Sequence, residues 1–243
     1  MKVRTFLSAA EAESGEVAGH TAVVIDVIRA TSTIVEALAA GARAVYPTVS
    51  TEDAIRIANS LGRDDTLLCG ERKGLKIPGF DLGNSPSEFT SESVGGMRLV
   101  MSTTNGTRAF LAAEDADRIV AASLMNLSAV VESVRDADRI ALICAGREGR
   151  FSLDDALCAG VIIRELEGDG EAAERDLDDA SRAVLALSAK FKPDLALLRS
   201  TEAGAALVEV GLEADLSACA SRDRHDLVPE MGDRTIRVPE KGS

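Results

Sequence analysis

The stretch Thr21–Leu38, TAVVIDVIRATSTIVEAL, decides the fold of this chain. Its residues 22–25 are apolar and mostly β-branched, which is typical of a strand buried on both faces of a parallel sheet. Asp26 ends this run, and apolar residues then recur at helical spacing from Ile34 until Gly41 offers a stop. A buried strand, a polar turn and a helix in direct succession predict an α/β protein.

The turn between this strand and this helix is an expected anion site. Arg29 precedes the hydroxyl residues Thr31, Ser32 and Thr33. Hydroxyl groups can cap the helix, and backbone N–H groups at its positive end attract anions. Because Asp26 stands beside this site, we expect a metal ion to bridge the acid and the anion.

The same order of strand, polar loop and helix recurs along the chain. Further strands are expected at residues 43–46, 66–69, 98–101, 117–121 and 140–144, with a short edge strand at residues 3–7. These elements predict a mostly parallel sheet with helices packed against it. We expect one unit over residues 1–243, with the option of two α/β subdomains, about 1–100 and 101–243, that share one active site.

Polar loops follow the strands at residues 26–33, 102–108 and 144–150, and a long irregular segment covers residues 70–96. The carboxyl ends of parallel strands meet at one edge of a sheet, where open α/β sheets bind ligands. The acids in or beside these loops are Asp26, Glu71, Asp81, Glu148, Asp154 and Asp155, and the cations are Arg29, Arg72, Lys73, Lys76, Arg108, Arg147 and Arg150. Oxygen ligands for Mg²⁺ beside cations for phosphate oxygens are what phosphoryl transfer requires.

Composition excludes several other classes of protein. The net charge of −13 argues against nucleic acid and anionic membranes as partners. No apolar run is long enough for a membrane span or a signal peptide, and the four cysteines lie far apart, as free thiols in a reducing compartment would. We therefore expect a cytoplasmic protein, and the Ala-rich, helical C-terminal third could supply the face of a homodimer.

Known phosphate chemistries are only partly represented in the sequence. No Walker phosphate loop and no dinucleotide-binding glycine motif follows a strand. Cys144 and Arg150 have the Cys-x5-Arg spacing of cysteine-dependent phosphatases, in which a thiolate attacks phosphorus. Glu148 inside that loop would repel a phosphate dianion, and Cys144 could equally be the last buried residue of a strand. The thiolate mechanism stays open as an alternative.

Four ordered blocks of sequence resemble the 2-phosphosulfolactate phosphatase family. The blocks are Asp26–Thr33, Gly70–Pro86, Ser102–Arg108 and Cys144–Asp155. The resemblance implies a three-layer α/β fold and a Mg²⁺-dependent hydrolase. It also implies that the enzyme releases phosphate from 2-phosphosulfolactate to give 3-sulfolactate, a step on the route to coenzyme M.

The leading hypothesis is a metal-assisted phosphatase for a small anionic phosphorylated substrate. The expected Mg²⁺ ligands are Asp26 and Glu71 with one or more of Glu148, Asp154 and Asp155. The expected catalytic groups are Asp26, Glu148 and, as a reserve general acid or base, Asp81. The expected substrate contacts are Arg29, Thr31, Ser32, Thr33, Arg72, Thr104, Asn105, Gly106, Thr107, Arg108, Arg147 and Arg150. A module that binds small organic anions without turnover is the non-enzymatic alternative.

Overall fold

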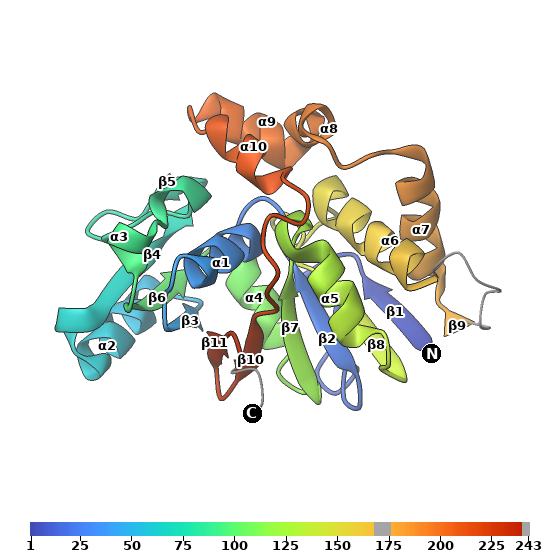
Figure 1. Ribbon diagram of the computed structural model, residues 1–243, viewed down its shortest axis with the longest axis horizontal. Helices are drawn as coiled ribbons and strands as arrows, with labels where there is room; N and C mark the ends of the chain where they lie inside the picture. Colours follow the sequence, from blue (N-terminus) through green and yellow to red (C-terminus); the bar gives the residue numbers. More distant parts are fainter. Residues whose placement is uncertain (168–175, 240–243) are drawn as a thin grey trace.

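The computed structural model describes residues 1–167 and 176–239. Its centre is a single 11-stranded sheet (Figure 1). In spatial order the strands are β5 (Leu75–Lys76), β4 (Thr66–Arg72), β6 (Arg98–Ser102), β3 (Ala44–Thr48), β11 (Thr235–Arg237), β10 (Glu230–Gly232), β7 (Arg118–Ala122), β2 (Thr21–Ile25), β8 (Arg139–Cys144), β1 (Lys2–Phe6) and β9 (Asp176–Leu177). The expected strands along the chain are confirmed, but β1 is not the edge strand that was expected, because it lies between β8 and β9.

The sheet contains two parallel blocks of strands. One block is β4–β6–β3, and the other is β7–β2–β8–β1 with β9 at its edge. The antiparallel hairpin β10–β11 joins them, because β10 pairs with β7 and β11 pairs with β3. These hairpin strands have three residues each, which is too short for a visible alternation of apolar and polar residues.

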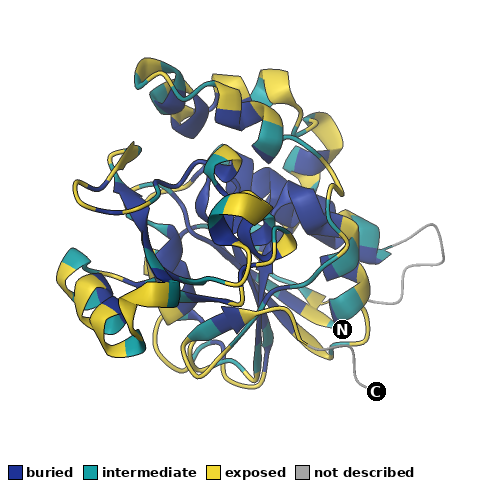
Figure 2. Cartoon of the chain, turned by 60° about the vertical axis from the view of Figure 1, so that its left-hand side comes forward, coloured by how far each residue is buried: buried dark blue, intermediate teal, exposed yellow. Residues whose placement is uncertain are grey.

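Helices cover both faces of the sheet. They are α1 (Ala30–Ala39), α2 (Thr51–Leu61), α3 (Ser91–Val94), α4 (Gly106–Ala112), α5 (Leu127–Val134), α6 (Leu153–Glu167), α7 (Asp179–Lys190), α8 (Leu195–Ser200), α9 (Glu202–Glu209) and α10 (Ala214–Cys219). In β2, Val23 and Ile25 pack into a core shared with α5 and α6, whereas Ala22 and Val24 pack into a core shared with α1 and α4. The fold is therefore α/β with three layers, and Figure 2 shows the buried strands between helices with exposed outer faces.

The helical C-terminal third of the chain is divided into short helices. Within it, α8 and α9 meet at Thr201. The Thr201 hydroxyl accepts a hydrogen bond from the Gly204 N–H and so begins α9. Helices α8, α9 and α10 lie together at the top of the molecule in Figure 1. No helix in the described parts of the chain is long and apolar enough to cross a bilayer.

Candidate active site

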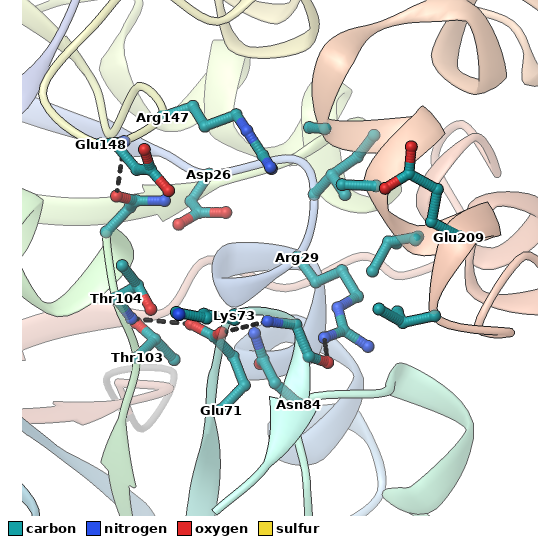
Figure 3. Close-up of a pocket in the computed structure, with 17 residues that line it drawn as sticks. Asp26, Arg29, Glu71, Lys73, Asn84, Thr103, Thr104, Arg147, Glu148 and Glu209 are labelled. Atoms are coloured by element: carbon teal, nitrogen blue, oxygen red, sulfur yellow. Dashed lines mark hydrogen bonds between the residues drawn. The ribbon is translucent and has the colours of Figure 1, made fainter.

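A cavity of about 290 Å³ opens where polar loops from both parallel blocks meet helix α9 (Figure 3). The loops after β2, β6 and β8 contribute Asp26, Asn105 and Glu148, and the carboxyl end of β4 contributes Glu71. The charged residues in the cavity wall are Asp26, Arg29, Glu71, Lys73, Arg147, Glu148 and Glu209. Segments far apart in sequence thus bring acids and cations to one cavity, as the order of strands and loops predicts.

Asp26 is buried at the end of β2, with 6% of its surface exposed. Its Oδ1 accepts a hydrogen bond of 3.0 Å from the Ala30 N–H at the start of α1. The pKa of the Asp26 carboxyl is raised to about 7, and burial is the main cause. The charges of Asp154 and Glu71 also raise this pKa, whereas the hydrogen bond from the Ala30 N–H and the charge of Arg29 lower it. A carboxyl group with this pKa can both accept and donate a proton near neutral pH.

Glu71 is fixed by backbone groups of two loops. Its Oε1 accepts a 2.7 Å hydrogen bond from the Thr104 N–H, and its Oε2 accepts one of 2.8 Å from the Gly74 N–H. Lys73 and Gly74 form the turn between β4 and β5, and both have positive φ angles, of 52° and 81°. The Glu71 carboxylate therefore holds this hairpin turn against the loop that follows β6.

Two arginines border the cavity, and their surroundings differ. The Arg29 guanidinium is buried, and it donates hydrogen bonds to Asp215 and to the Gly74 carbonyl. The Arg147 side chain has no hydrogen-bond partner among the described residues, and it is only half-buried. In the view of Figure 3, Arg147 lies above Asp26 and Arg29 lies below it. Arg147 is thus a cation free to bind an anion, whereas Arg29 is held in a fixed orientation.

The hydroxyl residues at the start of α1 face away from the cavity. Thr31, Ser32 and Thr33 are completely buried, and their hydroxyls donate to the carbonyls of Asp26, Val27 and Asn84. The N–H groups of Thr31 and Thr33 also donate to backbone carbonyls. The structure therefore places these groups in the framework of the turn and not in the expected cradle for phosphate. The turn includes a cis peptide bond between Ile28 and Arg29.

The loop after β6 reaches the cavity only in part. Thr104 and Asn105 line it, and the Asn105 Oδ1 accepts a hydrogen bond of 3.1 Å from the Glu148 N–H. Gly106 is buried directly against Asp26, while the Thr107 hydroxyl donates to the Thr103 carbonyl. Asn105 therefore joins this loop to the loop after β8.

Asp154 and Asp155 lie behind the cavity and do not line it. Asp155 accepts hydrogen bonds from the N–H groups of Val27 and Gly146, and so ties the loop after β2 to the loop after β8. Asp154 accepts one from the Ser152 hydroxyl. Burial raises the pKa of both carboxyl groups, and for Asp155 the charges of Asp154 and Asp26 add to this effect. The two acids thus position the loops, and they do not extend to a ligand in the cavity.

Four further expected site residues lie outside the cavity. Arg108 and Arg150 are exposed, and the Arg72 guanidinium donates to the carbonyls of Glu71, Val49 and Ser102 and to the Ser102 hydroxyl. Asp81 accepts hydrogen bonds from Arg63 and from the Leu68 N–H. Asp81 therefore stabilises the long loop after β4 and does not line the cavity.

The thiolate alternative does not fit the structure. Cys144 is fully buried in the core between β8, α5 and α6. Burial, together with the nearby Asp155 charge, raises the pKa of its thiol well above the usual value. A thiol of this kind is not ionised near neutral pH, and it cannot reach a substrate. The structure therefore argues against the cysteine-dependent mechanism, and all four cysteines are buried, free thiols.

Comparisons with known proteins show the family of this chain. A protein-family model described as 2-phosphosulpholactate phosphatase matches residues 6–234. The chain belongs to this family. Relatives named "Probable 2-phosphosulfolactate phosphatase" are 40% identical in Clostridium perfringens strain 13, over all of this chain and 98% of the relative, and 42% identical in Thermus thermophilus, over 87% of each chain. The relative of that name from Thermotoga petrophila is 40% identical over 87% of this chain and 89% of its own.

In this member of the 2-phosphosulpholactate phosphatase family, several cavity residues are not among the catalytic, substrate-binding and metal-binding residues expected from the sequence. They are Ile28, Lys73, Gly74, Asn84 and Thr103, and Ala203, Ala206, Leu207, Glu209 and Val210 on or next to α9. Of these, Lys73 was expected among the cations of the loops, although no role was given to it. The sequence of α9 does not indicate that this helix lines the cavity, because the sequence of a helix does not show which loops it will pack against.

Two cavity residues carry oxygen atoms without hydrogen bonds. Asn84 is buried, with 4% of its surface exposed, and its Oδ1 has no partner among the described residues; nor has the Thr104 Oγ1. Buried oxygen atoms usually have partners, so these two indicate a place for a ligand. No three acidic, histidine or cysteine side chains of the described residues come together as a metal cluster. Mg²⁺ often binds through one or two carboxylates and keeps several waters, so Glu71 and Asp26 with these two oxygens fit it.

Proposed function

We propose that this chain is a phosphatase that hydrolyses 2-phosphosulfolactate to 3-sulfolactate and phosphate. One observation carries the proposal: a buried carboxyl group with a pKa of about 7, on Asp26, lies in a cavity that Arg29 and Arg147 also line. An acid that exchanges protons near pH 7 beside two guanidinium groups suits hydrolysis of a phosphate ester. Membership of the family supports the choice of substrate.

The cations of the cavity suit a substrate with several negative charges. The proposed substrate carries phosphate, carboxylate and sulfonate groups, and the cavity wall carries Arg29, Lys73 and Arg147. The whole chain has a net charge of −13, so attraction of this substrate depends on these local cations. The Arg147 side chain has no hydrogen-bond partner among the described residues, so it can move to contact the phosphoryl group. The plane of the Arg29 guanidinium is fixed, so it can bind an oxyanion in one orientation.

The reaction requires movement of one proton. The oxygen of a water molecule bonds to phosphorus, the ester P–O bond breaks, and the leaving oxygen of the hydroxy acid takes a proton. We assign to Asp26 the acceptance of the proton from water, because its pKa lies near neutral pH. We assign to Glu148, at the exposed rim of the same cavity, the donation of a proton to the leaving oxygen.

Mg²⁺ is the proposed cofactor. Glu71, Asn84 and Thr104 would hold it directly, and Asp26 would hold it through water. When bound, the ion would polarise the phosphoryl group and offset its charge. The cytoplasmic location, the homodimer and the role in coenzyme M biosynthesis stay predictions.

The test is release of inorganic phosphate from 2-phosphosulfolactate, with Mg²⁺ and with a chelator. We expect turnover with Mg²⁺, and we expect Asp26→Asn to reduce kcat by at least about 100-fold, in line with loss of a general base. Asp81→Asn is the matched control outside the cavity. Tight binding of the substrate without release of phosphate at any Mg²⁺ concentration would instead identify an anion-binding module.

A further inference from the structure

A buried ion pair connects the first active-site turn to the C-terminal helices. Arg29 Nη1 lies 2.7 Å from Asp215 Oδ2, and each side chain is only 3% exposed. The two residues are 186 positions apart in sequence. The second oxygen of Asp215 accepts a hydrogen bond from the Ser85 hydroxyl. Both oxygens of this buried carboxylate are therefore bonded, as a buried charge requires.

The pair fixes the plane of a guanidinium that borders the cavity. Arg29 Nη1 donates to Asp215, and Nη2 donates to the Gly74 carbonyl at 2.6 Å. A guanidinium has five N–H groups in a rigid plane, so two bonds set the direction of the other three. Those three have no acceptor among the described residues, although Arg29 lines the cavity. They are available to an oxyanion placed there.

Asp215 lies on a segment that also supplies a wall of the cavity. Helix α10, which carries Asp215, packs against α8 and against the short turn at Pro86–Glu88, and α9 lines the cavity. Among the described ion pairs, Arg29–Asp215 is the one that links α8–α10 to an active-site loop, because Arg199–Glu213 lies within the segment. The position of Arg29 thus depends on how these helices are seated.

We propose that Asp215 is a positioning residue, which orients the Arg29 guanidinium toward an oxyanion of the substrate and makes α8–α10 part of the active site. The assignment depends on the proposed function in one respect: it takes that oxyanion to be the phosphate group of the ester substrate. Nothing in the local sequence around Asp215 suggests this role, because the partner, Arg29, comes from the opposite end of the chain.

The experiment compares Asp215→Asn, Asp215→Glu and the matched control Glu213→Gln. Glu213 is an acid two positions away whose side chain is 45% exposed, so its substitution removes the ion pair with Arg199 without touching Arg29. Two quantities are measured for each folded variant: the Kd for inorganic phosphate by calorimetry, and KM and kcat with 2-phosphosulfolactate. The melting temperature of each variant, recorded in parallel, reports its structural contribution.

We expect Asp215→Asn to raise the Kd for phosphate and the KM by about tenfold or more, the usual effect of losing a charge-assisted hydrogen bond. Asp215→Glu keeps the charge, so it should restore part of the affinity, and Glu213→Gln should match the wild type. A purely structural role would lower the melting temperature and leave Kd and KM unchanged, which would overturn the proposal.

The two proposals fail in different ways. A wild-type protein that binds phosphate but does not hydrolyse 2-phosphosulfolactate would refute the proposed function. The Kd for phosphate can be measured without turnover, so it would still test the role of Asp215. If Asp215→Asn binds phosphate as tightly as the wild type does, the positioning role is wrong even when the enzyme is active.

Discussion

A β-carbon at Gly106 would lie 2.8 Å from Oδ2 of Asp26 and 2.4 Å from the β-carbon of Ala30. Neither neighbour can move freely, because Ala30 begins α1 and Asp26 bonds to its N–H. Close approach of α4 to the turn between β2 and α1 therefore requires glycine at position 106. The carboxyl group of Asp26 is placed by the backbone of a loop about eighty residues away in sequence as well as by its own turn.

Gly106→Ala should displace Asp26 and lower kcat/KM by about 100-fold, as a shift of about 1 Å in a reacting group does. The measurement is phosphate release, with the melting temperature recorded to confirm folding. Gly232→Ala is the control, because a β-carbon there meets no atom within 4 Å. Full activity in Gly106→Ala would mean that the position of Asp26 is not critical to the reaction.

The fold was largely predictable because its main signals are local. The apolar run before Asp26 and the helical spacing after Ile34 are set by burial of one strand and one helix face. The convergence of the loops followed from the behaviour of parallel strands. The hairpin β10–β11 was not predictable, since strands of three residues gain their stability from pairing with β7 and β3.

The site was predictable in its residue types but not in their directions. Hydroxyls after a strand suggest a phosphate cradle, yet Thr31 bonds back to the Asp26 carbonyl. Ser152 and Asp155 have the spacing of a helix-capping pair, but the Asp155 carboxylate bonds to Val27 and Gly146. The hydrogen-bond partner of each side chain depends on which backbone groups the tertiary structure leaves unpaired. The order of residues alone does not contain this information.

The second prediction concerns Cys144. Cys144→Ala should leave kcat/KM within about twofold of the wild type and reduce stability by about 1–2 kcal/mol, because it removes a buried sulfur atom from a packed core. Cys158→Ala, at an equally buried position, is the control and should behave alike. A large loss of activity in Cys144→Ala alone would restore the thiolate mechanism that its burial excludes.

The third prediction separates two arginines of one turn. Arg147 and Arg150 exchange backbone hydrogen bonds, but only Arg147 lines the cavity. Arg147→Gln should raise KM by about 10- to 100-fold through loss of a charge-assisted contact to phosphate, whereas Arg150→Gln should not change it. Steady-state kinetics at two salt concentrations would check this. An equal effect of both substitutions would point to general electrostatic attraction instead of a specific contact.

The fourth prediction is a pH-dependent gain in stability from Asp26→Asn. The folded protein holds a proton on Asp26 up to a pKa of about 7, whereas the unfolded chain releases it near the ordinary value of 3.8. Between these two pH values the folded state binds more protons than the unfolded state, so raising the pH lowers the free energy of unfolding. Above pH 7 the carboxylate is ionised in both states, and the whole loss of stability from burying its charge remains. An asparagine has no charge to bury, and its oxygen can still accept from the Ala30 N–H. In metal-free buffer, the melting temperature of Asp26→Asn should therefore exceed that of the wild type by several degrees at pH 8, and by little near pH 4.

Thermal unfolding at pH 4, 6 and 8 measures this difference. The control is Asp136→Asn, at an exposed position whose side chain makes no hydrogen bond or ion pair with the described residues, and it should follow the wild type at each pH. The same Asp26→Asn variant should be inactive, so activity and stability change in opposite directions at one residue, as expected where a charge is buried for function. If Asp26→Asn is equally or less stable than the wild type at pH 8, the buried carboxylate carries no cost, and its raised pKa and its assigned proton transfer would both have to be abandoned.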